Sequence, residues 1–234
     1  MKAKSLRALL ARVVDYAGLY PPASLPLGEV VSNYERYLQS REAWMLNRLV
    51  LPLEELGNVA LGKKWRVTLL VQGEPGPLPP QVETLEWKSG RRLSLPTYCE
   101  APLERVEDGY AKVRTAGATT ETLAEFLCAA AARRLPFKAT AGLHHAIRDS
   151  MHGFLNVFAG AVFVWWGMDR TALTDLLNET DPHAFRFGND ALRWRDWRVL
   201  TSQVAQARRE FAHSFGSCSF EEPVDDLRAL DLLP

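Results

Sequence analysis

Short runs of hydrophobic residues recur along the whole chain, and most alternate with longer stretches of helical periodicity. The short runs are rich in Val, Leu, Phe, Tyr and Thr, and glycine, proline or polar residues bound them, which is typical of β-strands. They comprise residues 48–52, 65–71, 82–87, 95–101, 110–116, 136–142, 184–187 and 214–220. The pattern therefore predicts eight strands.

Amphipathic and apolar helical patterns fill much of the remaining sequence. Near the N-terminus, Leu6, Leu9, Leu10, Val13 and Val14 fall on one helical face, which predicts a helix that ends at Gly18. Further helices are predicted over residues 27–46, 119–134 and 153–179, and in the closing segment "EPVDDLRALDLL".

Strands that alternate with helices indicate parallel βαβ units. We therefore predict an α/β fold over residues 1–234, a single compact (β/α)₈ barrel with trimmed early units and residues 1–46 as an extra N-terminal helical segment. The alternative is an open doubly wound sheet. That fold often carries a glycine-rich phosphate loop, and neither GxGxxG nor GxxxxGK[ST] occurs in this chain.

The overall charge and the cysteine content narrow the range of partners. The 28 basic residues balance the 28 acidic ones, so no net field attracts nucleic acid or an anionic membrane. The most apolar stretch, "GFLNVFAGAVFVWWGM", is too short for a comfortable bilayer crossing. The three cysteines are far apart and lack metal-finger spacing, which favours reduced thiols in the cytoplasm. We expect a cytoplasmic protein with a small-molecule substrate and leave homo-oligomerisation open.

Two lysines are the most informative candidates, because the chain holds few lysines and these two lie within apolar strand-like runs. Lys112 alternates with Arg114 on one predicted strand, and Lys138 alternates with Thr140 on the next, so each pair points to one side. In a barrel, both lysines could enter one cavity at the C-terminal ends of the strands. Two close ammonium groups repel, and the lysine that loses its proton could attack a carbonyl to form a Schiff base.

Other polar residues near the predicted strand ends complete this hypothesis. Glu100 or His144 would move protons, and Arg114 with Ser217 would hold an anionic group. The less specific interpretation is that the lysines pair with Glu86 or Glu100, or bind an anionic ligand.

The segments "AKVRTAG" and "PFKATAG" resemble the paired lysine strands of the deoxyribose-phosphate aldolase family, class I aldolases built on a (β/α)₈ barrel. The resemblance implies the Schiff-base role for Lys112 and, for Lys138, the role of a second lysine that lowers the pKa of the first. "SFGSCSF" is similar to the late phosphate-binding turn of that family, which implies substrate contacts for Gly216, Ser217 and Ser219.

The chain departs from the family pattern at three points. Arg114 stands where the family has a hydrophobic residue, and the Gly-Gly-Ile/Val-Arg phosphate loop has no counterpart. The proton-shuttling aspartate has no clear match unless Glu100 replaces it. The segments "DYAGLYPPA", "FKATAGLHH" and "FGSCSFEEP" also resemble a set of bacterial proteins of unassigned function, and that likeness implies no mechanism.

Three histidines give the alternative hypothesis. His144, His145 and His152 follow the Lys138 strand closely, and His145 and His152 would share a face if the segment were helical. Such a cluster could bind a divalent metal ion and support a metal-dependent lyase or hydrolase. Otherwise no cofactor is expected, and His145 and Thr140 would contact the substrate. A third hypothesis is a non-catalytic barrel that binds a small ligand.

Overall fold

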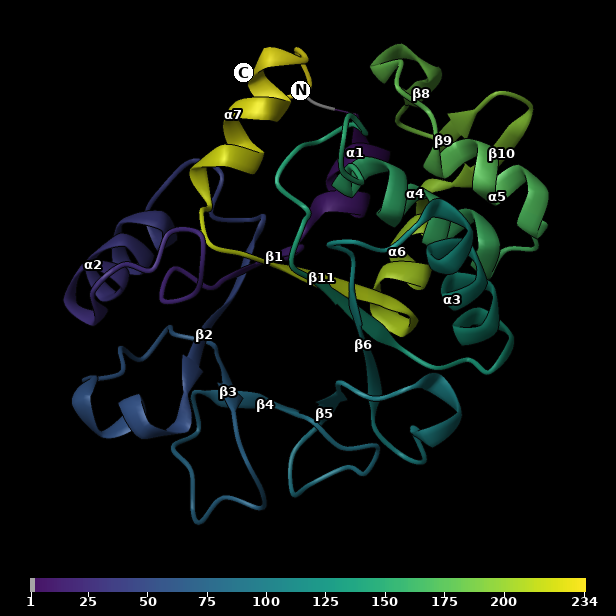
Figure 1. Cartoon of the computed structure of the whole chain (residues 1–234). Helices are drawn as coiled ribbons and strands as arrows, with labels where there is room; N and C mark the ends of the chain where they lie inside the picture. Colours follow the sequence, from purple (N-terminus) through teal and green to yellow (C-terminus); the bar gives the residue numbers. More distant parts are fainter. Residues whose placement is uncertain (1–2) are drawn as a thin grey trace.

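A closed parallel barrel forms the centre of the molecule, seen nearly along its axis in Figure 1. The computed structural model describes residues 3–234. The strand order around the barrel is β1-β11-β7-β6-β5-β4-β3-β2, and every neighbouring pair is parallel. This order confirms the predicted (β/α)₈-type barrel and excludes the open doubly wound sheet. The barrel strands are β1 (Val14–Tyr16), β2 (Leu46–Pro52), β3 (Val67–Leu70), β4 (Val82–Trp87), β5 (Thr97–Cys99), β6 (Tyr110–Arg114), β7 (Phe137–Thr140) and β11 (Ala212–Ser217).

The N-terminal region differs from the predicted helical segment 1–46, whose first two residues lie outside the described part. Helices α1 (Lys4–Leu10) and α2 (Leu27–Leu38) are present, but β1 lies between them and closes the barrel between β11 and β2. The prediction failed there because β1 has only three residues, all buried, and shows no alternation of polar and apolar positions.

The predicted strand 184–187 lies outside the barrel. It forms β8 (Phe185–Phe187), the edge of an antiparallel sheet with β9 (Ala191–Trp194) and β10 (Trp197–Leu200). The eight predicted strands therefore included one that does not belong to the barrel and omitted β1. The alternating basic and aromatic residues of 193–198 form the hairpin between β9 and β10, with Arg195 at a left-handed φ of 48° in its turn.

The helices cover the barrel unevenly (Figure 1). Helices α3 (Thr120–Ala132), α4 (Phe154–Trp165), α5 (Arg170–Leu177) and α6 (Thr201–Glu210) follow the late strands, and α7 (Glu221–Ala229) ends the chain. Between β2 and β6 the connections hold only two 3₁₀ turns, η1 (Leu53–Asn58) and η2 (Leu103–Arg105). The predicted helix 153–179 is two helices, because the chain turns at Gly167 with φ of 101°. Within residues 3–234, no helix has the length and apolarity that a bilayer crossing requires.

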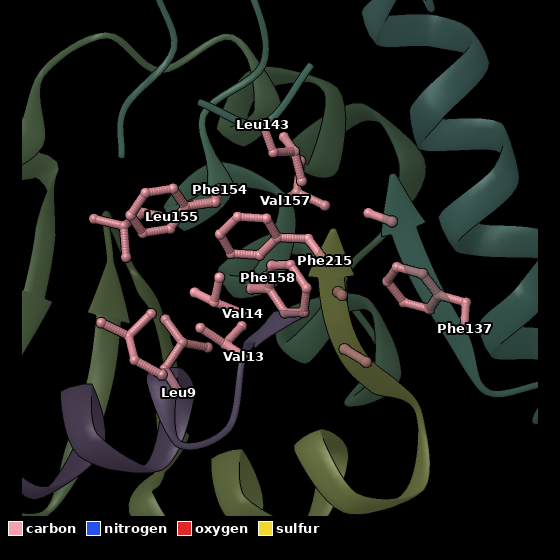
Figure 2. Packing of buried hydrophobic residues seen from close by; sticks show 14 of the residues in the cluster. Leu9, Val13, Val14, Phe137, Leu143, Phe154, Leu155, Val157, Phe158 and Phe215 are labelled. Carbon is pink, nitrogen blue, oxygen red and sulfur yellow. The ribbon is translucent and has the colours of Figure 1, made fainter. Parts of the chain in front are cut away.

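The main core packs helix α4 against the outer face of β1, β7 and β11 (Figure 2). Phe215 of β11 stacks on Phe154 with ring centroids 5.3 Å apart. Phe137 of β7 stacks on Phe158 with ring centroids 6.4 Å apart. Because side chains alternate along a strand, this outward packing turns Lys138 and Ser214 toward the barrel interior. The hydrophobic core thus fixes the orientation of the polar residues inside the barrel.

Candidate active site

The two lysines lie side by side on adjacent strands. Lys112 of β6 and Lys138 of β7 are direct register partners, and both line a cavity of about 390 Å³. Arg114 and Thr140 are the next inward pair along the same strands and line the same cavity. The structure therefore brings together the four residues that the sequence placed on these two strands.

Lys138 is completely buried between two carboxylates. Its Nζ donates to Asp15 Oδ2 at 2.6 Å and to Glu86 Oε1 at 2.5 Å. Burial lowers the pKa of Lys138, but the two carboxylates outweigh burial and raise the pKa above its ordinary value. The repulsion argument for a neutral lysine is therefore wrong for Lys138, which is held as an ammonium ion.

Asp15 and Glu86 are equally buried and are ionised by their neighbours. Burial raises the pKa of each carboxyl, and the cations overcome it, so both pKa values are lowered. Lys138 and Arg48 lower the pKa of Asp15. Asp15 also accepts hydrogen bonds from Ser214 Oγ at 2.8 Å and Asn47 Nδ2 at 2.6 Å. Lys138 and Lys112 lower the pKa of Glu86 in the same way.

Lys112 continues the same network toward solvent. Its Nζ lies 2.7 Å from Glu86 Oε2 and 2.8 Å from Glu100 Oε2. The Lys112 side chain is 9% exposed and that of Glu100 is 24% exposed, whereas Lys138 is 1% exposed. Arg114, 60% exposed, lies 3.9 Å from Glu100. We call Asp15, Lys138, Glu86, Lys112 and Glu100 the charge chain; it runs from the buried interior to the cavity mouth.

Tyr20 adds an unsatisfied hydroxyl to the cavity. Tyr20 lines it from the loop after β1, and within residues 3–234 its buried Oη has no hydrogen-bond partner. Burial, reinforced by Glu86, raises the pKa of Tyr20, so the hydroxyl keeps its proton. A buried donor without a partner is costly unless a ligand or water satisfies it.

The three histidines do not form a common site. His144 lines the cavity, with Nδ1 3.4 Å from Glu222 Oε2. His145 does not line the cavity, and its Nδ1 lies 3.2 Å from Asp226 Oδ2. His152 is buried between Arg148 and the carbonyl of Ala118. The segment between them is a loop, not a helix, so the expected shared face does not exist. His144, His145 and His152 are therefore not placed to bind one metal ion together, and His145 does not line the cavity in which its substrate contact was predicted.

The late-strand turn contributes less than the resemblance implied. Gly216 lines the cavity, but Ser217 and Ser219 do not. The Ser217 Oγ accepts from the Ser219 backbone N–H at 3.3 Å, and the Ser219 Oγ accepts from the Glu222 N–H at 3.2 Å. Both serines thus stabilise the turn into α7. A different trio, His144, Cys218 and Glu222, is the set in residues 3–234 whose donor atoms could surround a metal ion, with all three within 4.8 Å of one another.

Sequence patterns underestimated Asp15 and missed Tyr20. Asp15 is the one charged residue in "VVDYAG", and that isolation among apolar residues was the available signal. Tyr20 stands in "LYPPAS", which is indistinguishable in sequence from an ordinary turn. Glu86, by contrast, was expected to pair with the lysines, and it does so with both.

Comparison with protein-family models, curated proteins and solved structures gives no match to this chain. The aldolase resemblance therefore stays a prediction.

Proposed function

We propose that the protein is a lyase-type enzyme that forms an imine between Lys112 and a small anionic carbonyl compound. The observation that carries this proposal is the position of Lys112 Nζ, at the cavity and between the Glu86 and Glu100 carboxylates. A lysine must shed a proton before it attacks a carbonyl, and an adjacent carboxylate can accept it.

Lys112 suits the nucleophilic role better than Lys138. Lys138 is enclosed, bonded to two carboxylates and has a raised pKa. Its ammonium ion instead orients Glu86, whose second oxygen contacts Lys112. Lys138 would therefore act as a positioning residue.

The groups around Lys112 match the steps of imine formation. Glu100 accepts the ammonium proton, and the amine adds to the carbonyl carbon to give a carbinolamine. The same proton returns to the carbinolamine hydroxyl, which leaves as water as the C=N bond forms. Tyr20 can donate a hydrogen bond to the carbonyl oxygen, and Arg114 can pair with an anionic group of the substrate.

The composition of the barrel interior supports a functional role. Branched aliphatic side chains fill the interior of most (β/α)₈ barrels. Here the charge chain occupies it, and buried ion pairs often stabilise a protein less than apolar residues of the same volume. Clustered buried charges with shifted pKa values are typical of functional sites.

Borohydride trapping tests the proposal directly. The protein is incubated with a panel of small keto acids and phosphorylated aldehydes, reduced, digested and mapped by mass spectrometry. We expect one stable adduct on Lys112, absent from Lys112→Met. Adducts confined to the exposed Lys63 and Lys64, or no adduct with any compound, would contradict the proposal.

The second candidate is a barrel that binds a small anion without reacting. Arg114 favours it, because its guanidinium lines the cavity, is 60% exposed and lies 3.9 Å from Glu100, so it can pair with an anion. In that case the same panel would include compounds that bind by calorimetry and leave no adduct after reduction.

A further inference from the structure

We infer that His144, Cys218 and Glu222 bind one divalent metal ion of the zinc class at the rim of the cavity. This site does not depend on the imine, since it uses none of the residues of the charge chain. It also differs from the histidine cluster that the sequence suggested, with which it shares only His144.

The fold brings the three residues together through two neighbouring strands. β7 and β11 are adjacent in the barrel, with Thr140 in register with Gly216. His144 lies in the loop after β7, and Cys218 directly follows β11. Glu222 is in the first turn of α7, which begins three residues after Cys218.

The donor atoms are close to the spacing that a metal requires. A ring nitrogen of His144, the Sγ of Cys218 and a carboxylate oxygen of Glu222 all lie within 4.8 Å of one another. Bonds of ~2.0–2.3 Å to zinc place tetrahedral neighbours roughly 3.5 Å apart. The Glu222 side chain is 55% exposed, and within residues 3–234 its carboxylate bonds only to His144, so it can close this gap by rotation.

The chemistry of the donors selects the class of metal. A thiolate with an imidazole and a carboxylate suits zinc and related transition metals, whereas magnesium and calcium prefer oxygen ligands alone. Two of the three donors are anionic when they bind, so their charge balances that of a divalent ion. Cys218 is buried and forms no disulfide in the described part of the chain, so its thiol is available.

Three protein donors would leave one position of a tetrahedral ion open. His144 and Cys218 both line the cavity, while Glu222 approaches from α7 outside the lining. Three protein ligands and one open position are the arrangement of catalytic rather than structural zinc. The open position would take water or an oxygen of the ligand, which the metal would polarise.

Metal titration of the full chain tests the inference. After dialysis against a chelator, the protein is titrated with Zn²⁺ against a chromophoric competitor, and separately with Co²⁺ while its absorption spectrum is recorded. We expect one ion per chain and a thiolate-to-cobalt charge-transfer band in the near ultraviolet. Cys218→Ser should abolish that band and weaken zinc binding at least ~10-fold, and His144→Asn should weaken it similarly.

Two variants serve as matched controls. His145→Asn removes the neighbouring histidine, which pairs with Asp226, and Cys128→Ser removes a thiol on α3. Neither should change the stoichiometry or the spectrum. Absence of one-to-one binding, or a cobalt band that survives in Cys218→Ser, would overturn the inference. Borohydride trapping on Cys218→Ser separates the two proposals, because loss of the metal does not remove Lys112.

Discussion

Lys138 is a buried charge at the wall of the cavity, and its carboxylate partners decide its protonation state. Asp15 and Glu86 sit at hydrogen-bond distance, and the Tyr98 ring lies 5.4 Å from Nζ. Removing one partner of such a group leaves the other charges buried and uncompensated.

We therefore predict that Lys138→Met lowers the free energy of unfolding by about 3–5 kcal/mol at neutral pH. Urea denaturation followed by circular dichroism measures this. Asp15→Asn should also destabilise, and the double variant should cost less than the sum, because the stranded carboxylate is gone. Arg36→Ala is the control: its pair with Glu221 is exposed, so its loss should cost less than about 1 kcal/mol. Additive effects at Lys138 and Asp15 would contradict the coupling.

His213 gives the protein a pH dependence of stability. Burial, with Arg208 nearby, lowers the pKa of His213 to about 4. The ring stays neutral when folded, with Nδ1 2.9 Å from the Tyr98 hydroxyl and Nε2 3.1 Å from the Arg209 carbonyl. The unfolded chain takes up a proton near pH 6.5, so stability is present above that pH and is lost as the pH falls toward 4.

His213→Gln should remove most of this dependence. We expect the wild type to lose about 2–3 kcal/mol through this residue between pH 7 and pH 4. Denaturation curves at several pH values, compared between wild type and variant, measure the difference. His183→Gln, at an exposed position, is the control and should follow the wild-type profile. Parallel profiles for wild type and His213→Gln would show that another group is responsible.

The loop after β7 is the element that links the barrel to the candidate metal ligands. Ala141 and Gly142 both have positive φ values, 55° and 88°, and they redirect the chain so that His144 faces the cavity. A Cβ on Gly142 would lie 2.9 Å from the Ala116 backbone, so this turn has no room for a side chain.

Gly142→Ala should therefore destabilise by about 2–4 kcal/mol, which combines the left-handed φ and the backbone clash. It should also weaken zinc binding, since it displaces His144. Gly117→Ala is the matched control. Gly117 has φ of 75°, but an added Cβ would meet open space, so a loss of only about 1 kcal/mol in the free energy of unfolding is expected. Thermal denaturation and the zinc titration measure both effects. Equal losses in the two variants would show that the close approach to Ala116 is unimportant.

Helices and strands with a regular spacing of hydrophobic residues were predictable from the sequence. A strand that is recognisable only because it closes the barrel was not. The strand predicted at 82–87 matches β4 residue for residue, because its flanking turns are marked by proline and glycine. β1 was not predicted, because it has only three residues and all are buried, so no alternation of polar and apolar positions marks it. The lysine pair followed from strand alternation, whereas the contacts of Asp15 with residues 123 and 199 positions away depend on the closure of the barrel.

At the scale of the molecule, the barrel has one wall backed by helices and one backed by loops. β1, β7 and β11 pack on α4, whereas the connections around β3, β4 and β5 contain no α-helix. The β5–β6 seam has two register pairs, and the β6–β7 seam has four. Lys138 belongs to the helix-backed wall, and Glu100 follows β5 in the other.

This asymmetry predicts unequal protection of backbone amides in hydrogen exchange. Local opening needs less free energy where few apolar contacts cover a strand, so amides of β4 and β5 should exchange at least ~10-fold faster than those of β7 and β11. Native-state exchange with mass-spectrometric or NMR detection measures this, and uniform rates across the barrel would contradict it.

A ligand that contacts both Lys112 and Arg114 should draw Glu100 and β5 toward the wall that is backed by helices. Protection should then rise at β5 and stay constant at β11, which would locate the adaptable side of the cavity.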